Sequence, residues 1–340
     1  MSVERRISDA RVAELVGLIR STSGETRPLR APFTNEAIAQ IPVSSLDDVD
    51  AAFVAARTAQ ESWATTPLAA RKRVLRRFQH LLTQHQDEIL DLIQLEGGKV
   101  RRDAWVEIMH TSLNARYYRR TLGKHLKPER RNPGAPVLMG MRVHHTPKGV
   151  VGVISPWNYP LTMAIPDALA AIAAGNAVIQ KPDSQSPLTM IAALALLREA
   201  GLPDDVWQVV SGSGSVVGSA IIDQADYICF TGSTATGIGI AKKLADRLVG
   251  ASLELGGKNP MIVLPGANVE RTAAGAIHAC FHGAGQTCVS IERLYVHDSL
   301  YDDFKNAFAR RVDALEIGPG NSWETEIGSL VSADQVEGVV

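Results

Sequence analysis

Between residues 149 and 248, short apolar runs alternate with segments of helical periodicity. The apolar runs cover residues 150–154, 177–180, 206–210 and 227–230, and a helical pattern follows each of them. Strands that alternate with helices at this interval form a parallel sheet with helices on both faces. The sequence therefore predicts a doubly wound α/β fold, in which ligands bind at the carboxyl ends of the strands.

The segments on either side predict helices before this sheet and a second α/β unit after it. Residues 1–45 contain three prolines that break long elements, so we expect an arm with a short strand pair. Helical patterns before the sheet cover residues 47–59, 67–85, 86–95 and 103–121. After residue 255, apolar runs at 260–264 and 293–296 alternate with helical patterns at 268–280 and 299–315. The second unit therefore begins with the same alternation as the first.

A third feature is a break in the helical pattern at residues 128–136, which carry Asn132 and Gly134. Residues 137–145 then alternate weakly between polar and apolar side chains. We expect residues 132–148 to form a hairpin that projects from the body and serves subunit contacts. An ordinary edge strand would show the same alternation.

The composition gives no reason to expect certain partners. The chain of 340 residues has a formal net charge of −1, so nucleic acid and anionic membranes are not expected as partners. No apolar run approaches the ~20 residues that a bilayer span requires. The first residues mix both charges where a secretion signal has an apolar core. We therefore expect a cytoplasmic protein.

The three cysteines, Cys229, Cys280 and Cys288, are too few and too irregularly spaced for a disulfide framework or a zinc site. Cys229 lies within a predicted strand and Cys280 on an apolar helix, so both are expected to pack as small hydrophobic residues. Cys288 differs because Gly285 and Gln286 precede it in a small polar loop. A nucleophilic thiol must be accessible, and Cys288 is the candidate.

Glu254 lies between two leucines and precedes two glycines. A carboxylate at the end of a partly apolar strand suits a general base. The alternative is a structural ion pair with Lys258.

Residues 232–237 follow a predicted strand and open a helix, with Gly232 and Ser233 at the turn. Free amides at a helix start bind anions, although a serine cap alone would give the same pattern. Residues 211–214 form a second, weaker glycine-rich turn. Lys181 and Ser184 follow another strand, where a lysine can reach a ribose or a phosphate.

Five motifs in this order resemble the aldehyde dehydrogenase superfamily. They are residues 154–160 (Ile-Ser-Pro-Trp-Asn-Tyr-Pro), 181–182 (Lys-Pro), 230–233 (Phe-Thr-Gly-Ser), 254–258 (Glu-Leu-Gly-Gly-Lys) and 285–288 (Gly-Gln-Thr-Cys). The resemblance runs from about residue 47 to the end. The sequences of residues 253–260 and 181–184 are similar to those of the succinate-semialdehyde branch of this superfamily.

The resemblance implies a covalent mechanism. Cys288 attacks the aldehyde carbonyl, and the Asn158 amide and the Cys288 backbone N–H hold the oxyanion. Hydride transfer to the cofactor leaves a thioester, which water activated by Glu254 hydrolyses. Relatives that pass the acyl group to coenzyme A usually lack this glutamate, so Glu254 favours water.

The resemblance also implies a dinucleotide site. Its residues are Ile154, Ser155, Pro156, Trp157, Lys181, Ser184, Gly214, Phe230, Gly232, Ser233 and Leu255. Many relatives that prefer NAD have glutamate where this chain has Ser184, so NADP is the expected cofactor, with NAD possible and no metal. We expect residues 1–131 and 149–255 to form the dinucleotide-binding domain, and residues 256–340 to form an incomplete catalytic domain.

Two departures from the family pattern bear on these expectations. Succinate-semialdehyde enzymes commonly hold the substrate carboxylate with arginines, whereas this chain has Pro166 and His282 at the aligned positions. Relatives also continue beyond this length, with a Glu-x-Phe-Gly-Pro motif and a strand that docks on a partner subunit. We therefore expect a piece of a longer dehydrogenase that assembles as a dimer or tetramer. The alternatives are a dehydrogenase for another aldehyde and a catalytically silent relative.

Overall fold

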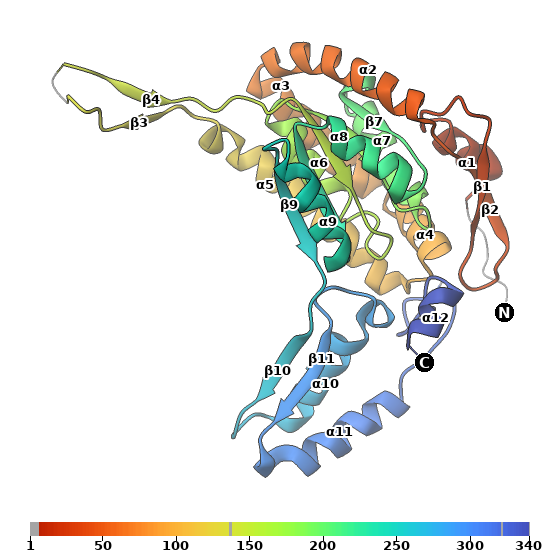
Figure 1. Ribbon diagram of the computed structural model, residues 1–340. Coiled ribbons are helices and arrows are strands. Elements are labelled where there is room, and N and C mark those ends of the chain that lie inside the picture. The colour runs from red at the N-terminus through yellow and green to blue at the C-terminus, as the bar shows by residue number, and fades with distance from the viewer. Residues whose placement is uncertain (1–6, 136–137, 321, 340) are drawn as a thin grey trace.

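The computed structural model describes residues 7–135, 138–320 and 322–339. Its main sheet has five parallel strands in the order β7-β6-β5-β8-β9 (Figure 1). The strands are β5 (Val150–Ile154), β6 (Ala177–Lys181), β7 (Trp207–Val209), β8 (Tyr227–Gly232) and β9 (Gly250–Leu255). The predicted doubly wound α/β sheet is thus confirmed, and four of its strands lie within two residues of their predicted limits.

Helices cover both faces of this sheet because successive strand side chains point to opposite sides. On β8, Cys229 packs into one core while Ile228 and Phe230 pack into the other. The first core is built with α1 (Asp9–Val16), α3 (Leu68–Gln84), α4 (Gln86–Gly97), α5 (Arg101–His125), α6 (Ile165–Ala173) and α7 (Pro187–Glu199). The second is built with α2 (Leu46–Thr65), α8 (Ser219–Gln224) and α9 (Thr234–Ala245).

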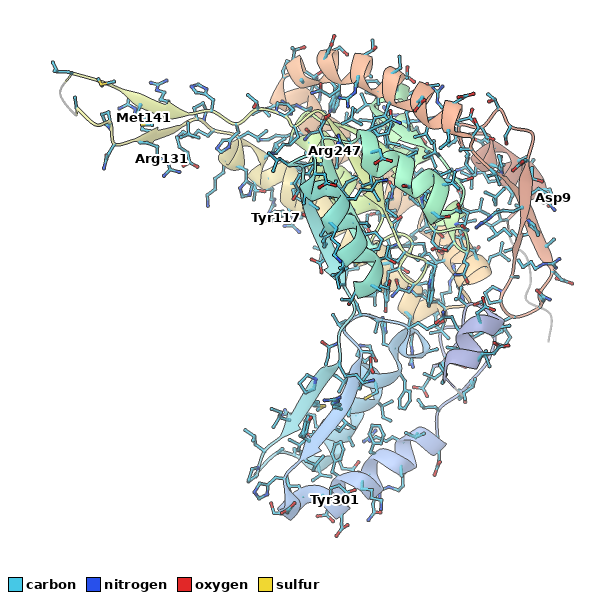
Figure 2. All side chains as sticks on the ribbon, in the orientation of Figure 1. Asp9, Tyr117, Arg131, Met141, Arg247 and Tyr301 are labelled. Atoms are coloured by element: carbon cyan, nitrogen blue, oxygen red, sulfur yellow. The ribbon has the colours of Figure 1, made fainter. Side chains whose placement is uncertain are left out.

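Two antiparallel hairpins lie outside the main sheet. The predicted amino-terminal strand pair is β1 (Thr26–Arg30) with β2 (Ala37–Pro42). The second hairpin, β3 (Glu129–Arg131) with β4 (Met141–Val143), extends from the body after α5 (Figure 1). Figure 2 shows the side chains of Arg131 and Met141 standing away from the rest of the chain. Residues 136 and 137 of this predicted hairpin lie outside the described residues.

The second unit follows β9 and has its own small core. Its strands β10 (Asn259–Val263) and β11 (Ile291–Val296) are parallel, and α10 (Val269–Phe281) and α11 (Tyr301–Asp313) accompany them. Val263, Phe304 and neighbouring alanines are buried together between these elements. In Figure 1 this unit forms a separate lower lobe. The boundaries of the predicted domains stay predictions.

Three local features differ from or add to the sequence-based expectations. Ser45 caps α2 through a capping box with Asp48. Arg71 on α3 is buried, and its guanidinium donates to the carbonyls of Thr66 and Ala173. The short helix α12 (Ala333–Val339) was not anticipated from periodicity.

Within the described ranges, the structure has no helix that is both long enough and apolar enough to cross a bilayer.

Candidate active site

A cavity of about 530 Å³ lies at the carboxyl ends of β8 and β9, beside α5 and the loop after α10. Residues from five separate segments line it. Of the residues predicted from sequence, it brings together Pro156, Trp157, Asn158, Gly232, Ser233, Glu254, Leu255 and Cys288. The candidate nucleophile, the candidate base and the phosphate-type turn therefore share one space.

Cys288 is exposed on a loop with unusual backbone geometry. Gly283, Ala284 and Gly285 all have positive φ values, of 61°, 57° and 77°. Ala284 pays a steric cost for this conformation that glycine does not. These left-handed residues turn the chain sharply between α10 and Cys288. The amide of Asn259 then fixes the loop by donating to the Cys288 carbonyl at 2.7 Å.

The other two cysteines lie in different environments. Cys229 is buried in β8, and burial raises the pKa of its thiol to about 12. Cys280 is half-buried on α10, where burial also raises its pKa. Cys288 is thus the cysteine whose thiol is exposed at the cavity.

Asn158 lies in the segment that follows β5. Its Nδ2 atom donates to the backbone carbonyl of Gln286 at 2.9 Å. The side chain therefore connects the end of the main sheet to the loop that carries Cys288.

Glu254 lies at the carboxyl end of β9, in register with Thr231 of β8. Its side chain makes no hydrogen bond or ion pair with any residue that the structure describes. Lys258 pairs instead with Glu292, so the alternative of a Glu254–Lys258 ion pair is wrong. Glu254 therefore remains available to a substrate or to water.

A buried ion pair supports the floor of the site. Lys99 Nζ lies 2.5 Å from Glu107 Oε1, and both side chains are almost fully buried. The other carboxylate oxygen of Glu107 accepts from the backbone amides of Leu161 and Thr162, at 3.0 and 3.1 Å. Glu107 therefore fixes the segment just after Asn158.

Tyr159 links this ion pair to the loop that carries Cys288. Lys99 Nζ lies 3.3 Å from the centroid of the Tyr159 ring, a cation–π contact. The ring also stacks on His282 with centroids 6.1 Å apart. Burial raises the pKa of Tyr159 above its ordinary value, which keeps its hydroxyl protonated, and the interaction with Thr287 opposes that shift.

Asp103 holds the start of the same loop. It accepts from the Gly283 amide at 2.7 Å, and its Oδ1 lies 2.9 Å from His282 Nδ1. Burial raises the pKa of Asp103, but His282, the Gly283 amide and Arg102 outweigh it and hold that pKa below its usual range. The His282 side chain therefore lies against a carboxylate of the protein itself.

These supporting residues were not found from sequence. Asp103 and Glu107 are four residues apart on one helix, and such a spacing places two carboxylates on one face. On a helix that is otherwise amphipathic, that pattern is more often a solvated face than a buried network. Asp103 contacts His282 and Gly283 of the second lobe, and Glu107 accepts from the amides of Leu161 and Thr162, contacts that the local pattern does not reveal.

The turn after β8 fits a phosphate group. A Cβ on Gly232 would lie 2.5 Å from the Phe230 ring, so this position requires glycine. Ser233 caps α9 by accepting from the Thr236 amide at 3.2 Å, while the first turn of this helix presents further amides. Donors of this kind match the pyrophosphate of a dinucleotide.

The remaining predicted cofactor residues lie outside the cavity. Ile154 and Lys181 are register partners on β5 and β6, and the Ser155 amide donates to the Lys181 carbonyl. Lys181 is buried and does not line this cavity. Ser184 lines a different cavity.

Phe230 and Gly214 are two further predicted cofactor residues that do not line this cavity. Phe230 is buried beneath Gly232. Gly214 begins a π-helical turn, and a Cβ there would meet open space.

No cluster of three or more His, Cys, Asp or Glu side chains able to hold a metal ion occurs in residues 7–135, 138–320 and 322–339.

Comparison with known proteins identifies the family. The model of the aldehyde dehydrogenase family matches residues 18–340. A relative from Mycolicibacterium smegmatis, named putative succinate-semialdehyde dehydrogenase [NADP(+)], is 46% identical over 97% of this chain and 64% of its own length. A D-glyceraldehyde dehydrogenase (NADP(+)) from Picrophilus torridus is 32% identical over 93% of this chain and 64% of its own length.

Solved structures agree with this result. The crystal structure of an E. coli NADP dependent enzyme matches with a TM-score of 0.91 and 32% identity, over 95% of this chain and 68% of that one. This chain spans about 64% of the length of the curated relatives that it matches. The chain belongs to the aldehyde dehydrogenase family.

Proposed function

We propose that the protein oxidises an aldehyde to a carboxylic acid with NAD(P) as the electron acceptor. The observation that carries this proposal is the single cavity shared by Cys288, Glu254, Asn158 and the Gly232–Ser233 turn. The matching family supports it. Because the chain covers less than two thirds of its curated relatives, the activity of the whole protein is part of the proposal.

The first step is addition of the Cys288 thiolate to the aldehyde carbon. The carbonyl oxygen becomes an oxyanion, which accepts hydrogen bonds from Asn158 Nδ2 and from the Cys288 backbone N–H. Asn158 Nδ2 has two N–H groups, and Gln286 occupies one of them. The second is free to meet the oxyanion.

The second half of the reaction releases the acid. A cofactor held at the Gly232–Ser233 turn would supply the acceptor for the hydride that leaves the carbon bound to Cys288. Glu254 then removes a proton from the water that attacks the resulting thioester, and the thiolate of Cys288 leaves. The net change consumes one water and yields the carboxylate, the reduced cofactor and two protons.

The cofactor in this proposal is NADP, with NAD as the weaker alternative. Trp157 and Ser233 border the cavity, while Lys181 is the last residue of β6 and Ser184 lies in the loop that follows it. Ile154, Ser155, Pro156, Gly214, Phe230, Gly232 and Leu255 complete the proposed binding set. A serine at position 184 leaves room for a phosphate where a carboxylate would repel it. The names of the M. smegmatis relative and of the E. coli enzyme both include NADP.

Succinate semialdehyde is the first candidate substrate, because the M. smegmatis relative carries that name. A second candidate is an uncharged aldehyde. Among the described residues that line the cavity there is no lysine or arginine, and Val106, Met109 and Leu113 give its α5 wall an apolar surface. His282, at one position where an arginine was expected, lies against Asp103.

Two further alternatives make different predictions. A catalytically silent relative would bind the cofactor without turnover. A coenzyme A-acylating enzyme would need an acceptor thiol in place of water, and Glu254 at the cavity supports hydrolysis instead.

The experiment that tests the function is NADP reduction in the presence of succinate semialdehyde, benzaldehyde and hexanal. It should be run on this 340-residue chain and on the full reading frame that contains it. Turnover with any aldehyde supports a dehydrogenase, and the ratio between succinate semialdehyde and the apolar aldehydes decides between the substrates. Cofactor binding without turnover would favour the silent relative.

We also propose self-association through the β3–β4 hairpin, as a dimer or tetramer. The hairpin extends away from the body (Figure 1), and Met139, Met141 and Val143 are exposed on it. A cytoplasmic location suits a reaction that depends on a reduced Cys288 thiol.

A further inference from the structure

A second cavity, of about 630 Å³, lies where the β1–β2 hairpin meets the loop after β6 and the segment before α12. Arg27, Arg30, Ser184 and Gln185 are among the residues that line it. It shares no lining residue with the cavity that holds Cys288. Ser184, one of the predicted cofactor residues, therefore lines this cavity and not the cavity that holds Cys288.

Strand geometry directs Arg27 toward the interior. Leu29 is 2% exposed, and residues two apart on a strand point to the same side. Arg27 is accordingly half-buried, while Pro28 and Arg30 are exposed. The Arg27 guanidinium therefore faces the loop that carries Ser184.

Among the residues that the structure describes, the Arg27 guanidinium has no partner, because it makes no hydrogen bond or ion pair with any of them. Arg30, by contrast, donates to the Asn35 carbonyl at 2.7 Å within its own hairpin. A partly desolvated guanidinium without a partner is costly unless it serves a ligand.

A second positive charge lies close to Arg27. Lys181 is 5% exposed, and its Nζ donates to the Pro182 carbonyl at 3.2 Å. Burial lowers the pKa of Lys181, the Asp183 carboxylate opposes this, and the charge of Arg27 lowers it further. Asp183 also accepts from the Gln185 amide at 2.9 Å, so it is shared between the lysine and its own loop.

Ser184 completes the set with a half-buried hydroxyl on the wall of the cavity. Two cations and a hydroxyl match a phosphate monoester, which carries up to two negative charges. A guanidinium can donate to two phosphate oxygens at once, which a ribose hydroxyl cannot accept in the same way.

We propose that Arg27 binds the 2′-phosphate of NADP, together with Ser184 and Lys181. This inference rests on the proposed dehydrogenase function and assigns part of its cofactor selectivity to the amino-terminal hairpin. NAD has a hydroxyl at this position, so it gains nothing from Arg27.

The test is direct binding of two nucleotide fragments to the intact protein by titration calorimetry. The fragments are 2′,5′-ADP, which carries the 2′-phosphate, and 5′-ADP, which does not. In Arg27→Gln, binding of 2′,5′-ADP should weaken at least about tenfold, because a hydrogen bond between charged groups is lost. Binding of 5′-ADP should change by less than about twofold, and Arg27→Lys should fall between the wild type and Arg27→Gln for 2′,5′-ADP.

Arg30→Gln is the matched control, because it removes a charge that lines the same cavity but already donates to the Asn35 carbonyl within its own hairpin. It should leave both affinities within about twofold, as expected for an exposed charge. Equal losses of 2′,5′-ADP affinity in Arg27→Gln and Arg30→Gln would show a general effect of positive charge instead of a specific contact, and would overturn the assignment. Unchanged 2′,5′-ADP binding in Arg27→Gln, or a wild type that binds 5′-ADP equally well, would overturn it too.

Aldehyde-dependent cofactor reduction, measured on the same proteins, separates this inference from the proposed function. If the wild type turns over and Arg27→Gln keeps its affinity for 2′,5′-ADP, the Arg27 assignment alone is overturned. The expected binding pattern in a wild type without turnover supports the phosphate site and overturns the dehydrogenase.

Discussion

The amide nitrogen of Asn158 donates to the backbone carbonyl of Gln286 at 2.9 Å. This bond joins the segment after β5 in the upper lobe to the loop that positions Cys288 in the lower lobe (Figure 1). One N–H of Asn158 thus fixes the loop, and the other can stabilise an oxyanion formed at the carbon that Cys288 attacks. Positioning and charge stabilisation therefore depend on the same side chain.

Asn158→Ala should lower kcat/KM for the best aldehyde by about 10²- to 10³-fold, the usual effect of losing one oxyanion donor. Asn158→Asp should be at least as severe, since it has the same shape but no N–H donor. Steady-state kinetics check both. A variant within threefold of the wild type would remove Asn158 from the mechanism.

Glu254→Gln should stop the reaction after the thioester forms. Because Glu254 is the proposed base for hydrolysis, kcat should fall by about 10²- to 10⁴-fold while the first turnover survives. Rapid mixing should show a burst of reduced cofactor equal to the enzyme, and intact-mass spectrometry should show an acyl adduct. Lys258→Met serves as the control, because Lys258 pairs with Glu292 and not with Glu254. Loss of the burst in Glu254→Gln would place this carboxylate before hydride transfer instead.

Glu107→Gln should destabilise the fold by about 3–5 kcal/mol, because it leaves the buried Lys99 ammonium without its counterion. Denaturant unfolding measures this directly. The exposed pair of Lys258 and Glu292 gives the contrast, since Glu292→Gln should cost less than about 1 kcal/mol. Equal costs for the two variants would mean that the Lys99–Glu107 pair does not hold the floor of the site.

Stability should also depend on pH through Glu96. Burial raises the pKa of this carboxyl to about 8, against the hydrogen bonds that it accepts from Leu188 and Thr189. A raised pKa favours the protonated form in the folded state, so its contribution is complete below the unfolded pKa and is lost as pH rises through about 8. Between pH 5 and 8, the wild type should therefore lose up to about 1.4 kcal/mol per pH unit relative to Glu96→Gln. Parallel curves for the two proteins would contradict the assignment.

The main sheet could be predicted because its strands are short apolar runs with both faces buried. Val150–Ile154 is apolar throughout, Ala177–Lys181 begins with three apolar residues, and this local signal needs no tertiary context. The strands of the second lobe were also found, although that lobe has only a small core.

The environment of the candidate site depended on contacts that sequence spacing does not encode. The motifs indicated Cys288, Glu254 and Asn158, but not the buried network of Lys99, Glu107 and Tyr159 beneath them. Lys99 lies just before α5, eight residues from Glu107, but Glu107 also binds the amides of Leu161 and Thr162, which are 54 and 55 residues away. Long-range pairing of this kind decides whether a helical charge is solvated or buried, as it also did for Arg71.

The most direct test of the account is Cys288→Ala in the intact protein, measured as aldehyde-dependent NADP reduction together with 2′,5′-ADP binding. Cys280→Ala is the matched control, because it removes a half-buried thiol from the helix before the same loop. We predict that Cys288→Ala abolishes turnover and leaves nucleotide affinity unchanged, while Cys280→Ala keeps both. Retained turnover in Cys288→Ala would contradict covalent catalysis by this residue.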